Sequence, residues 1–414
     1  MRRRQTRPVQ EHKPPFYVGI DTGKTLHHAL VVDATGTAWV PNVVPFANTR
    51  PGYTQLFALL AEATAQATPP EITVGCKATG SYWLNLYEAL LAQGYRVLVL
   101  KPLSVKVRRG TTLRGTKTDP VDARLIAEIL QRDHGPASHV PEAAVQGRRD
   151  LTRLRADLVA QLGDVKRRII SILDRTFPAF ATCFADVCGQ AARTRLETWT
   201  WPEQLAAVPT TRLAAVLARL SHGYFGAEKA RAVKAAAHQS IGVRRAADAL
   251  AFELRRLVRQ IRDLERLVAE LDQENGRRHA ALDQSLRPIP GLGAATAPAI
   301  YAESGDIWRF TDSDPLVALA GVAPQRHESG QTAGQAKMSK RGAPYLRRAV
   351  WHAALTACRF DPMFQAIDDR QRKRGKPHLV ALSHVANKLM RVIDAVLKGQ
   401  RPYDPQAHVP ATHC

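Results

Sequence analysis

Short apolar runs separated by turn-forming residues fill the first third of the chain. Three of them, with a turn at residues 34–36 between the second and the third, predict a three-strand meander. Two more runs flank an amphipathic stretch at residues 82–91, which ends at Gly94 and predicts a helix. The runs predicted as strands are residues 16–21, 27–33, 38–44, 72–76 and 96–101. Strands that first form a meander and then alternate with helices predict a mixed α/β domain.

The period of the apolar positions becomes helical after residue 150. Apolar residues recur every three or four positions from Leu151 to Ile172, and Phe177 with Pro178 ends the predicted helix. A second segment, residues 250–271, alternates steps of four and three, which is the spacing of a heptad seam. Such a seam favours a coiled coil between subunits, with a two-helix hairpin inside one subunit as the alternative.

The last part of the chain predicts a third, mainly helical unit. Gly291 and Gly293 lie in a Pro-Gly-Leu-Gly turn before an apolar stretch at residues 294–302, a pattern similar to the hairpin of a helix-hairpin-helix element. The backbone amides of such a hairpin can bind a phosphate. The alternative is an ordinary Pro-Gly turn before a helix, which has a similar sequence. The predicted divisions are a basic tail at 1–14, an α/β domain at 15–145, a helical coiled-coil region at 146–280 and a C-terminal domain at 281–414.

The net charge points to a polyanionic partner. The 414 residues include 59 Lys and Arg against 37 Asp and Glu, a formal net charge of +22. This surplus favours nucleic acids, whereas the alternative is a basic protein with no particular partner. No apolar run approaches the roughly 20 residues that span a bilayer, and the basic start leads into Pro and Glu rather than an apolar signal core. We expect a cytoplasmic protein that binds no membrane, with five scattered, reduced cysteines and no structural zinc.

Three aspartates of the α/β region form a candidate metal site. Asp21 ends the first predicted strand, while Asp119 and Asp122 lie three apart on one face of a predicted helix. Convergent carboxylates suit Mg²⁺, which prefers oxygen ligands and leaves positions open for phosphate and water. The alternative is capping, because Asp119 precedes a proline as an N-cap residue does. A basic stretch beside these residues predicts phosphate contacts through Lys106, Arg108, Arg109, Arg114 and Lys117.

Several short motifs occur in order over nearly the whole chain. They are YVGID at 17–21, ATGSYW at 78–83, KTDPVDA at 117–123, PGLG at 290–293, ALAGVAP at 318–324, ESG at 328–330 and SKRGAPYLRRAV at 339–350. In this combination they resemble the IS110/IS1111-type family of insertion-sequence transposases. The resemblance implies an α/β plus α architecture: a RuvC-like (RNase H-type) mixed-sheet domain of the DEDD type, a coiled-coil connection and a mainly helical C-terminal transposase domain. It also implies a DNA transposase or recombinase assisted by Mg²⁺.

One position departs from that family pattern. The resemblance implies a second acidic residue just before the ATG motif, where this chain carries Lys77. A protonated ammonium cannot ligate Mg²⁺, and between aspartates it competes with a metal ion by forming ion pairs. Glu71 lies six residues earlier, about 20 Å away along an extended strand, and is no obvious replacement. Either the site tolerates the loss of one ligand or the chain is catalytically impaired, and Lys77 favours impairment of the strand-cutting site.

A serine of the C-terminal domain is the candidate nucleophile. Ser329 lies in a polar stretch predicted as a loop, and its own neighbours indicate no more than a surface serine. The family resemblance implies instead that Ser329 forms a covalent phosphoserine link to DNA. Ser339 is the competing candidate, although it more naturally caps a turn or contacts a phosphate. The basic residues predicted to bind nucleic acid in this region are Lys337, Lys340, Arg341 and Arg347.

The resemblance also implies partners. They are donor and target DNA, a noncoding bridge RNA that pairs with both, and further copies of the chain in a homo-oligomer, a dimer or tetramer, where the acidic domain of one subunit meets the serine domain of another. We expect the protein at the bacterial nucleoid. Two alternatives stay open: a nucleic-acid-binding protein of the same fold that does not cleave strands, and a metal-dependent junction nuclease that uses water instead of Ser329.

Overall fold

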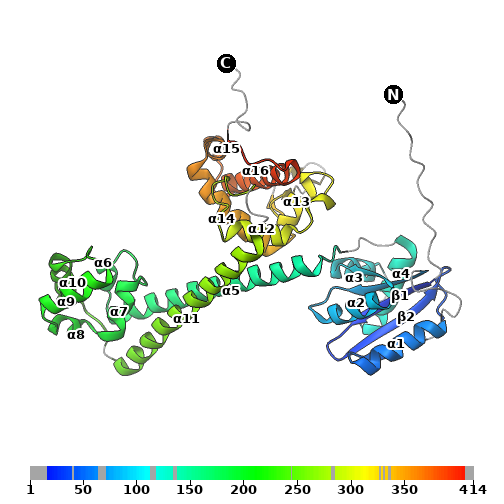
Figure 1. Cartoon of the computed structure of the whole chain (residues 1–414), viewed down its shortest axis with the longest axis horizontal. Coiled ribbons are helices and arrows are strands. Elements are labelled where there is room, and N and C mark those ends of the chain that lie inside the picture. Colours follow the sequence, from blue (N-terminus) through cyan, green and yellow to red (C-terminus); the bar gives the residue numbers. More distant parts are fainter. Residues whose placement is uncertain are drawn as a thin grey trace, which may run out of the picture. The chain divides into compact units, whose positions relative to one another are not determined.

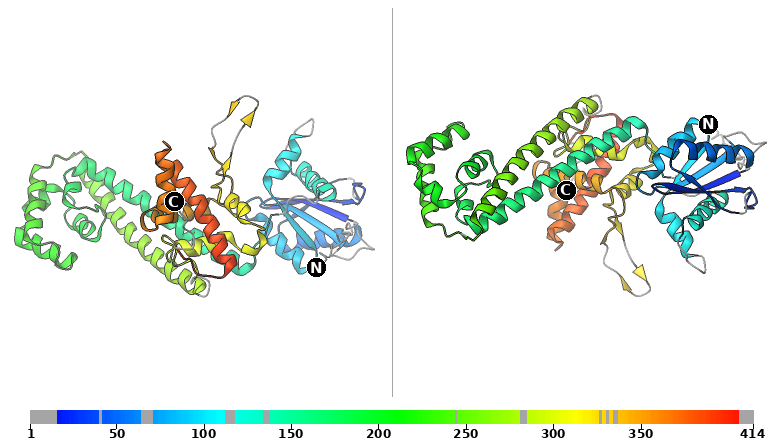
Figure 2. Two further views of the ribbon diagram at one scale, coloured as in Figure 1. Left: turned by 90° about the horizontal axis from the view of Figure 1, so that it is seen from above. Right: turned by 90° about the horizontal axis from the view of Figure 1, so that it is seen from below.

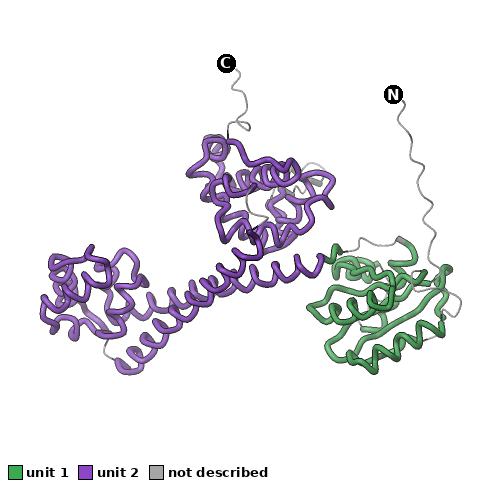
Figure 3. Tube along the Cα trace, viewed as in Figure 1, with its two compact units in different colours: residues 1–140 green, residues 141–414 purple. Residues whose placement is uncertain are grey.

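The structure of the chain is a computed structural model that divides into two compact units, Met1–Val140 and Pro141–Cys414 (Figure 3). Buried residues of the first unit lie on the two faces of a sheet, and those of the second unit form two helical cores. The structure describes residues 16–39, 42–63, 71–111, 118–133, 138–243, 245–280, 285–325, 328–329, 332–333 and 337–405. At residue 133, and at those of residues 324–337 that are included, it describes the backbone alone.

A five-stranded mixed sheet forms the first unit, with strand order β3-β2-β1-β4-β5 (Figure 1). β1 lies at its centre, antiparallel to β2 and parallel to β4. The strands are β1 Phe16–Thr22, β2 Leu26–Asp33, β3 Val44–Ala47, β4 Ile72–Lys77 and β5 Arg96–Leu100. The predicted mixed sheet is therefore confirmed, and its centre brings the ends of β1 and β4 together.

The third strand lies later in the chain than the pattern predicts. β3 begins only at Val44, so the strand predicted over residues 38–44 is wrong. The turn after β2 is extended because the carboxylate of Asp33 accepts hydrogen bonds from the backbone amides of Thr35 and Thr37. After this turn the chain pairs back with β2 at an isolated bridge, Ala38 with Val32, where the amide of Trp39 donates to the carbonyl of Val31. Apolar periodicity does not reveal that an Asp side chain shapes the turn and leaves a bridge in place of the predicted strand.

Helices cover both faces of the sheet. Apolar residues of α1 and α2 pack on the face that carries Val18 and Ile20. Those of α4 pack on the opposite face, against Tyr17 and Leu30. The four helices are α1 Arg50–Ala63, α2 Tyr82–Ala92, α3 Pro102–Gly110 and α4 Asp119–Asp133. Of these helices, α2 and α4 are predicted from the sequence, whereas α1 and α3 are not.

A glycine of β1 allows α4 to approach the sheet closely. A Cβ atom at Gly19 would lie 2.2 Å from the carbonyl oxygen of Ala123 and 2.4 Å from the amide nitrogen of Ala127. Side chains alternate along a strand, so Asp21 points to the same face as Gly19. The glycine therefore sets the first turn of α4 beside Asp21.

Two long helices form an antiparallel hairpin in the second unit (Figure 1). They are α5 Ala143–Thr176 and α11 Ala247–His279. The antiparallel direction follows from two ion pairs, Arg155 with Asp272 and Arg168 with Glu253. The buried heptad residues are Leu254, Leu257, Ile261 and Leu264, packed with Val165, Ile169 and Ile172. Because α5 of the same chain already covers these residues, the prediction that they form a coiled coil between subunits is wrong, and the hairpin alternative is correct.

Five short helices connect α5 to α11 and pack around the ends of both (Figure 2). Their buried residues, including Phe180, Leu196 and Leu213, join the apolar seam of the hairpin. The helices are α6 Phe180–Cys183, α7 Gln190–Thr198, α8 Pro202–Ala207, α9 Thr210–Leu220 and α10 Ala227–Gln239. The hairpin thus carries a small helical subdomain at one end, which is not among the elements predicted from the sequence.

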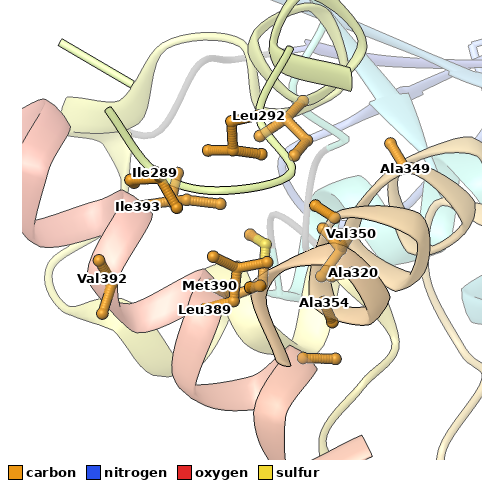
Figure 4. Packing of buried hydrophobic residues seen from close by; sticks show 14 of the residues in the cluster. Ile289, Leu292, Ala320, Ala349, Val350, Ala354, Leu389, Met390, Val392 and Ile393 are labelled. Carbon is orange, nitrogen blue, oxygen red and sulfur yellow. The ribbon is translucent and has the colours of Figure 1, made fainter. Parts of the chain in front are cut away.

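The C-terminal helices pack around a second core that includes Ile289, Val350 and Met390 (Figure 4). The elements are α12 Thr296–Ser304, η2 Ile307–Arg309, α13 Ser313–Ala320, α14 Pro344–Phe360, α15 Pro362–Lys373 and α16 His378–Gly399. Gly291 has a φ of +92°, and a Cβ there would lie 2.4 Å from the carbonyl oxygen of Ala353. Turns rather than a helix occupy residues 285–295, so the predicted helix-hairpin-helix element is not confirmed.

Polar contacts join this C-terminal bundle to α5. The buried carboxylate of Glu303 accepts hydrogen bonds from Arg153, at 2.6 Å from Nε and 3.0 Å from Nη2. The hydroxyl of Tyr345 donates to the carboxylate of Asp157 at 2.9 Å. All four residues belong to the second unit, so α5 is bonded directly to the C-terminal bundle.

Candidate active site

The centre of the sheet brings two sequence-predicted positions to one edge. Asp21 lies near the end of β1, and Lys77 is the last residue of the neighbouring parallel strand β4. The hydroxyl of Thr22 donates to the carbonyl of Lys77 at 3.3 Å, which ties the two strand ends together. Asp122, in the first turns of α4, completes the group because α4 approaches this face closely.

Lys77 lies between the two aspartates. Its Nζ is 2.8 Å from Oδ1 of Asp21 and 2.8 Å from Oδ2 of Asp122. The side chains are largely withdrawn from water: Lys77 is 14% exposed, Asp21 6% and Asp122 2%. The competition between lysine and metal that the sequence predicts therefore takes a definite form, an ammonium held by both carboxylates.

Arg109 of α3 supplies a second positive charge. Its Nε donates to Oδ1 of Asp122 at 3.1 Å, and its Nη2 contacts the same oxygen. Asp122 therefore binds Lys77 with one carboxylate oxygen and Arg109 with the other. Arg109 is predicted from the sequence to bind nucleic acid, but its guanidinium is already paired with this carboxylate.

The ionisation of the group follows from these contacts. Burial would lower the pKa of Lys77, but hydrogen bonds to Asp122 and Asp21 and their charges outweigh it, so the pKa is raised. Burial raises the pKa of Asp122, yet hydrogen bonds from Lys77 and Arg109 hold it below its ordinary value. For Asp21, burial prevails over the opposing effect of Lys77, and the pKa is raised. The ammonium of Lys77 is therefore charged at neutral pH.

These residues do not fit a divalent metal ion as they are arranged. Mg²⁺ requires carboxylate oxygens at about 2.1 Å in near-octahedral geometry. The oxygens of Asp21 and Asp122 that converge instead share the ammonium of Lys77, and the other Asp122 oxygen is taken by Arg109. Within the described part of the chain, no three His, Cys, Asp or Glu side chains are grouped to hold a metal.

Asp119 stands apart from the other two aspartates. Its side chain is 66% exposed, and Oδ2 lies 3.8 Å from Nδ1 of His28. Asp119 is not the N-cap residue of α4, as one prediction had it, but the first residue inside the helix. The N-cap position falls to Thr118, whose carbonyl accepts a hydrogen bond from the amide of Asp122. Asp119 thus faces solvent at the rim of the group.

The other basic residues predicted around the aspartates have different surroundings. Lys106 is exposed on α3, while Arg108 lies 3.5 Å from the carboxylate of Glu128. Arg114 and Lys117 fall outside the described residues. Of these predicted contacts, Lys106 is the cation that the described structure leaves open to a phosphate.

The predicted nucleophile lies on a β-hairpin rather than in a loop. Ser329 belongs to β7 (Glu328–Ser329), which pairs with β8 (Thr332–Ala333) so that Ser329 faces Thr332. A second pair, β6 (Pro324–Gln325) with β9 (Lys337–Met338), lies between this pair and the bundle. Figure 2 shows the strands in yellow, extending from the helices. The side chains of Ser329 and Lys337 fall outside the description.

The segment after the hairpin presents cations to solvent. Lys340 and Arg341 are exposed, whereas Arg347 donates from Nη1 to the carbonyl of Lys340 at 2.8 Å. The hydroxyl of Ser339 accepts a hydrogen bond from the amide of Arg341 at 3.2 Å, the capping contact that the sequence favours for this serine. A Cβ at Gly293 would meet no atom within 4 Å, so this side of its Cα is open, while its carbonyl accepts a hydrogen bond from the amide of Ala297 at 3.0 Å.

Two family models match the chain. Residues 18–178 match the DEDD type described as "Transposase", and residues 283–369 match the "Transposase IS116/IS110/IS902 family". The first match contains all three aspartates and the second contains Ser329, and together they cover more than half of the chain. The chain belongs to the IS110 family of transposases.

Relatives of this IS110-family transposase match almost its full length. The insertion element IS900 uncharacterized 42 kDa protein of Mycobacterium paratuberculosis is 29% identical, over 94% of this chain and 98% of its own. The pilin gene-inverting protein of Moraxella lacunata is 23% identical, over 95% and 98%. T. thermophilus RuvC in complex with a Holliday junction substrate is similar at 16% identity and a TM-score of 0.21, over 27% of this chain and 89% of its own.

The structure also adds a neighbour that sequence reasoning missed in this transposase. His28 pairs directly with Asp21 across β1 and β2 and lies beside Asp119. The signal was present, because the short turn between the two predicted strands fixes which residues are opposite each other. In the described part of this transposase, no helix has the length and apolar character to cross a bilayer.

Proposed function

We propose that this IS110-family transposase cuts and rejoins donor and target DNA through a covalent link to Ser329. Membership of a transposase family supports strand exchange as the reaction. The name of the Moraxella lacunata relative, a pilin gene-inverting protein, describes a DNA rearrangement and supports the same class. The position of Ser329 on a hairpin apart from the helical core supports access to a DNA strand.

The proposed reaction is a transesterification. The hydroxyl oxygen of Ser329 forms a bond to a phosphorus atom of the DNA backbone, and the bond from that phosphorus to one deoxyribose oxygen breaks. The proton lost by the serine goes to the departing strand as its new hydroxyl group. The hydroxyl of another strand then attacks the phosphorus of the phosphoserine, which releases the serine hydroxyl and forms a new phosphodiester bond between the strands. Each step exchanges one phosphoester bond for another, so the joining needs no external energy source.

We further propose that this chain carries out that reaction poorly. The observation that carries the proposal is Lys77, whose Nζ lies 2.8 Å from carboxylate oxygens of both Asp21 and Asp122. In the family pattern Asp21, Asp119 and Asp122 are the expected Mg²⁺ ligands. With the ammonium between two of them, the acidic residues bind Lys77 and Arg109 rather than a metal ion.

The proposed partners follow from the division of the chain. The aspartates belong to the first unit and Ser329 to the second, so a complete site requires both units, from one subunit or from two copies in a dimer or tetramer. Exposed Lys106, Lys340 and Arg341 are proposed to contact phosphates of donor DNA, target DNA or a noncoding bridge RNA. The protein would act in the cytoplasm on DNA of the nucleoid.

A second candidate function is nucleic-acid binding without strand cleavage. The paired state of Lys77 and Arg109 favours it, because the acidic group is already neutralised while exposed cations elsewhere remain open to phosphates. Such a protein would still bind the DNA ends. It would differ from the transposase in forming no covalent link.

Covalent adduct formation tests the proposal. The chain is incubated with Mg²⁺, the element's own DNA ends and its noncoding RNA, and compared with Lys77→Glu and with Lys77→Glu combined with Ser329→Ala. We expect adducts in Lys77→Glu alone, with the modified peptide mapped to Ser329 by mass spectrometry. Tight binding without an adduct in any of the three would refute the serine mechanism and support the binding protein. Strand cleavage that survives Ser329→Ala would support a junction nuclease that uses water.

A further inference from the structure

We propose that Lys77 is a resident cation that takes the place of a divalent metal ion, so that the first unit is complete without metal and takes up none. The inference rests on the proposed function in one respect, the assignment of Asp21 and Asp122 to the acidic site. It goes further in stating that the first unit needs no divalent ion for its stability and that its nucleic-acid binding does not depend on one.

The ammonium meets the geometric demands of a counter-ion. Its Nζ lies 2.8 Å from a carboxylate oxygen of Asp21 on β1, as an ion pair, and 2.8 Å from one of Asp122 on α4, to which it donates a hydrogen bond. A divalent ion does the same work in an acidic site, since it joins carboxylates from separate elements and removes their mutual repulsion. Here one side chain of the protein joins the strand and the helix.

Charge balance leaves nothing for a metal ion to neutralise at the centre of the group. Asp21 and Asp122 bring two negative charges, and Lys77 with Arg109 brings two positive charges. A divalent ion entering between the carboxylates would stand next to an ammonium and a guanidinium of like charge. The exposed carboxylate of Asp119 remains, and a single exposed aspartate is a weak ligand for a hard cation.

The backbone holds the ammonium where it is. Gly75 and Lys77 lie on the face of β4 that α4 covers, and a Cβ at Gly75 would meet the side chain of Leu130 at 2.6 Å. With α4 this close, the side chain of Lys77 is 14% exposed and runs from the strand end directly to the two carboxylates. If the ammonium swung out to water, it would leave two nearly buried carboxylates facing each other, which is costly.

Nucleic-acid binding by the first unit is then independent of divalent ions. A metal ion can bridge a carboxylate to a phosphate, but a carboxylate held by an ammonium cannot take part in such a bridge. The exposed Lys106 offers a direct phosphate contact instead. Binding would weaken with increasing monovalent salt and would respond little to removal of Mg²⁺ by a chelator.

The experiment is a titration of the full chain with Mn²⁺, followed by electron paramagnetic resonance of the free ion. Mn²⁺ occupies the same oxygen sites as Mg²⁺ and needs no DNA for its detection. The chain is compared with Lys77→Glu and with Lys77→Ala, which empties the position without adding a ligand. Lys101→Glu, the same charge change at an exposed lysine of the first unit, is the matched control.

We expect the unmodified chain and the control to bind Mn²⁺ only weakly and to the same extent. Lys77→Glu should bind at least about 100-fold more tightly, because a positive charge is replaced by a further ligand between two carboxylates. The gain should disappear when Asp122→Asn is added, and excess Mg²⁺ should displace the Mn²⁺. Lys77→Ala should show a smaller gain of the same kind.

Saturable Mn²⁺ binding by the unmodified chain that is lost in Asp21→Asn would overturn the proposal. So would a folded Lys77→Ala, verified by circular dichroism, whose Mn²⁺ affinity equals that of the control. If neither Lys77 variant folds, thermal unfolding of the unmodified chain decides: the midpoint should be the same in Mg²⁺ and in chelator, and a clear rise in Mg²⁺ contradicts a resident cation. These measurements need no DNA. The proposal can therefore fail while the serine mechanism holds, and the serine mechanism can fail while the proposal holds.

Discussion

The ion-pair group of the acidic site predicts a specific loss of stability when its ammonium is removed. Lys77→Met keeps a side chain of similar length but leaves Asp21 and Asp122, 6% and 2% exposed, opposed across the site. Removing one partner of a buried ion pair costs about 3–5 kcal/mol. Because Arg109 still neutralises Asp122, we expect the lower end, about 3 kcal/mol. That corresponds to a roughly 150-fold increase in the opening equilibrium of the first unit.

Hydrogen exchange read by mass spectrometry measures this change in the intact chain. Peptides from β1 and α4 report the first unit, while peptides from α16 in the second unit serve as the internal reference. Lys101→Met, at an exposed lysine of the same unit, is the control and should change exchange little. Adding Asp21→Asn to Lys77→Met should restore part of the protection, since one of the two unpaired charges is then removed.

Unchanged exchange of β1 and α4 in Lys77→Met would refute the reasoning. It would mean that the two carboxylates reach water or protonate at no cost when the ammonium is gone. An equal acceleration in Lys101→Met would also count against it, because the effect would then come from net charge rather than from the buried contacts.

Three other predictions concern the fold around the site and its support. Gly19→Ala should destabilise the first unit by more than about 2 kcal/mol, because the added Cβ would overlap the backbone of α4. Urea denaturation, monitored by hydrogen exchange in peptides of the first unit, measures this loss. The pKa of Lys77 is raised and that of Asp122 is lowered, so the ion pair between them should stabilise the fold fully between about pH 4 and pH 10. This stabilisation should be lost as the pH rises through the pKa of Lys77 or falls through the pKa of Asp122. Thermal unfolding measured against pH tests this, and Lys77→Met should lack the loss at alkaline pH. Arg153→Ala should weaken the second unit by about 3 kcal/mol, because it leaves the buried carboxylate of Glu303 without its bidentate partner, and faster exchange in α12 is the readout.

Much of the acidic site could be predicted because it rests on local signals. The apolar runs fix β1 and β4, and alternation along a strand places Asp21 on one face. The helical start near residue 119 places Asp122 in the first turns of α4. Chemistry alone then predicts that a lysine among these aspartates pairs with them, and the structure shows that pair.

The contribution of Arg109 was not predictable in the same way. The segment that forms α3 has few apolar positions, only Val105 of it is buried, and its basic residues resemble a solvated face. Its contact with Asp122 depends on how α3 and α4 pack, which is a tertiary event without a sequence period. The heptad seam of α11 shows the same limit, because periodicity reveals an apolar stripe but does not state which helix covers it.

The most direct test of the account is recombination of the element's own ends on a plasmid in cells that express the chain or Lys77→Glu, together with the noncoding RNA. Both proteins are brought to equal abundance, and sequencing counts the rejoined junctions. The account predicts that junctions are rare with the unmodified chain and become frequent with Lys77→Glu, and that Ser329→Ala removes them again. Frequent junctions with the unmodified chain, at the level of Lys77→Glu, would contradict a site closed by Lys77.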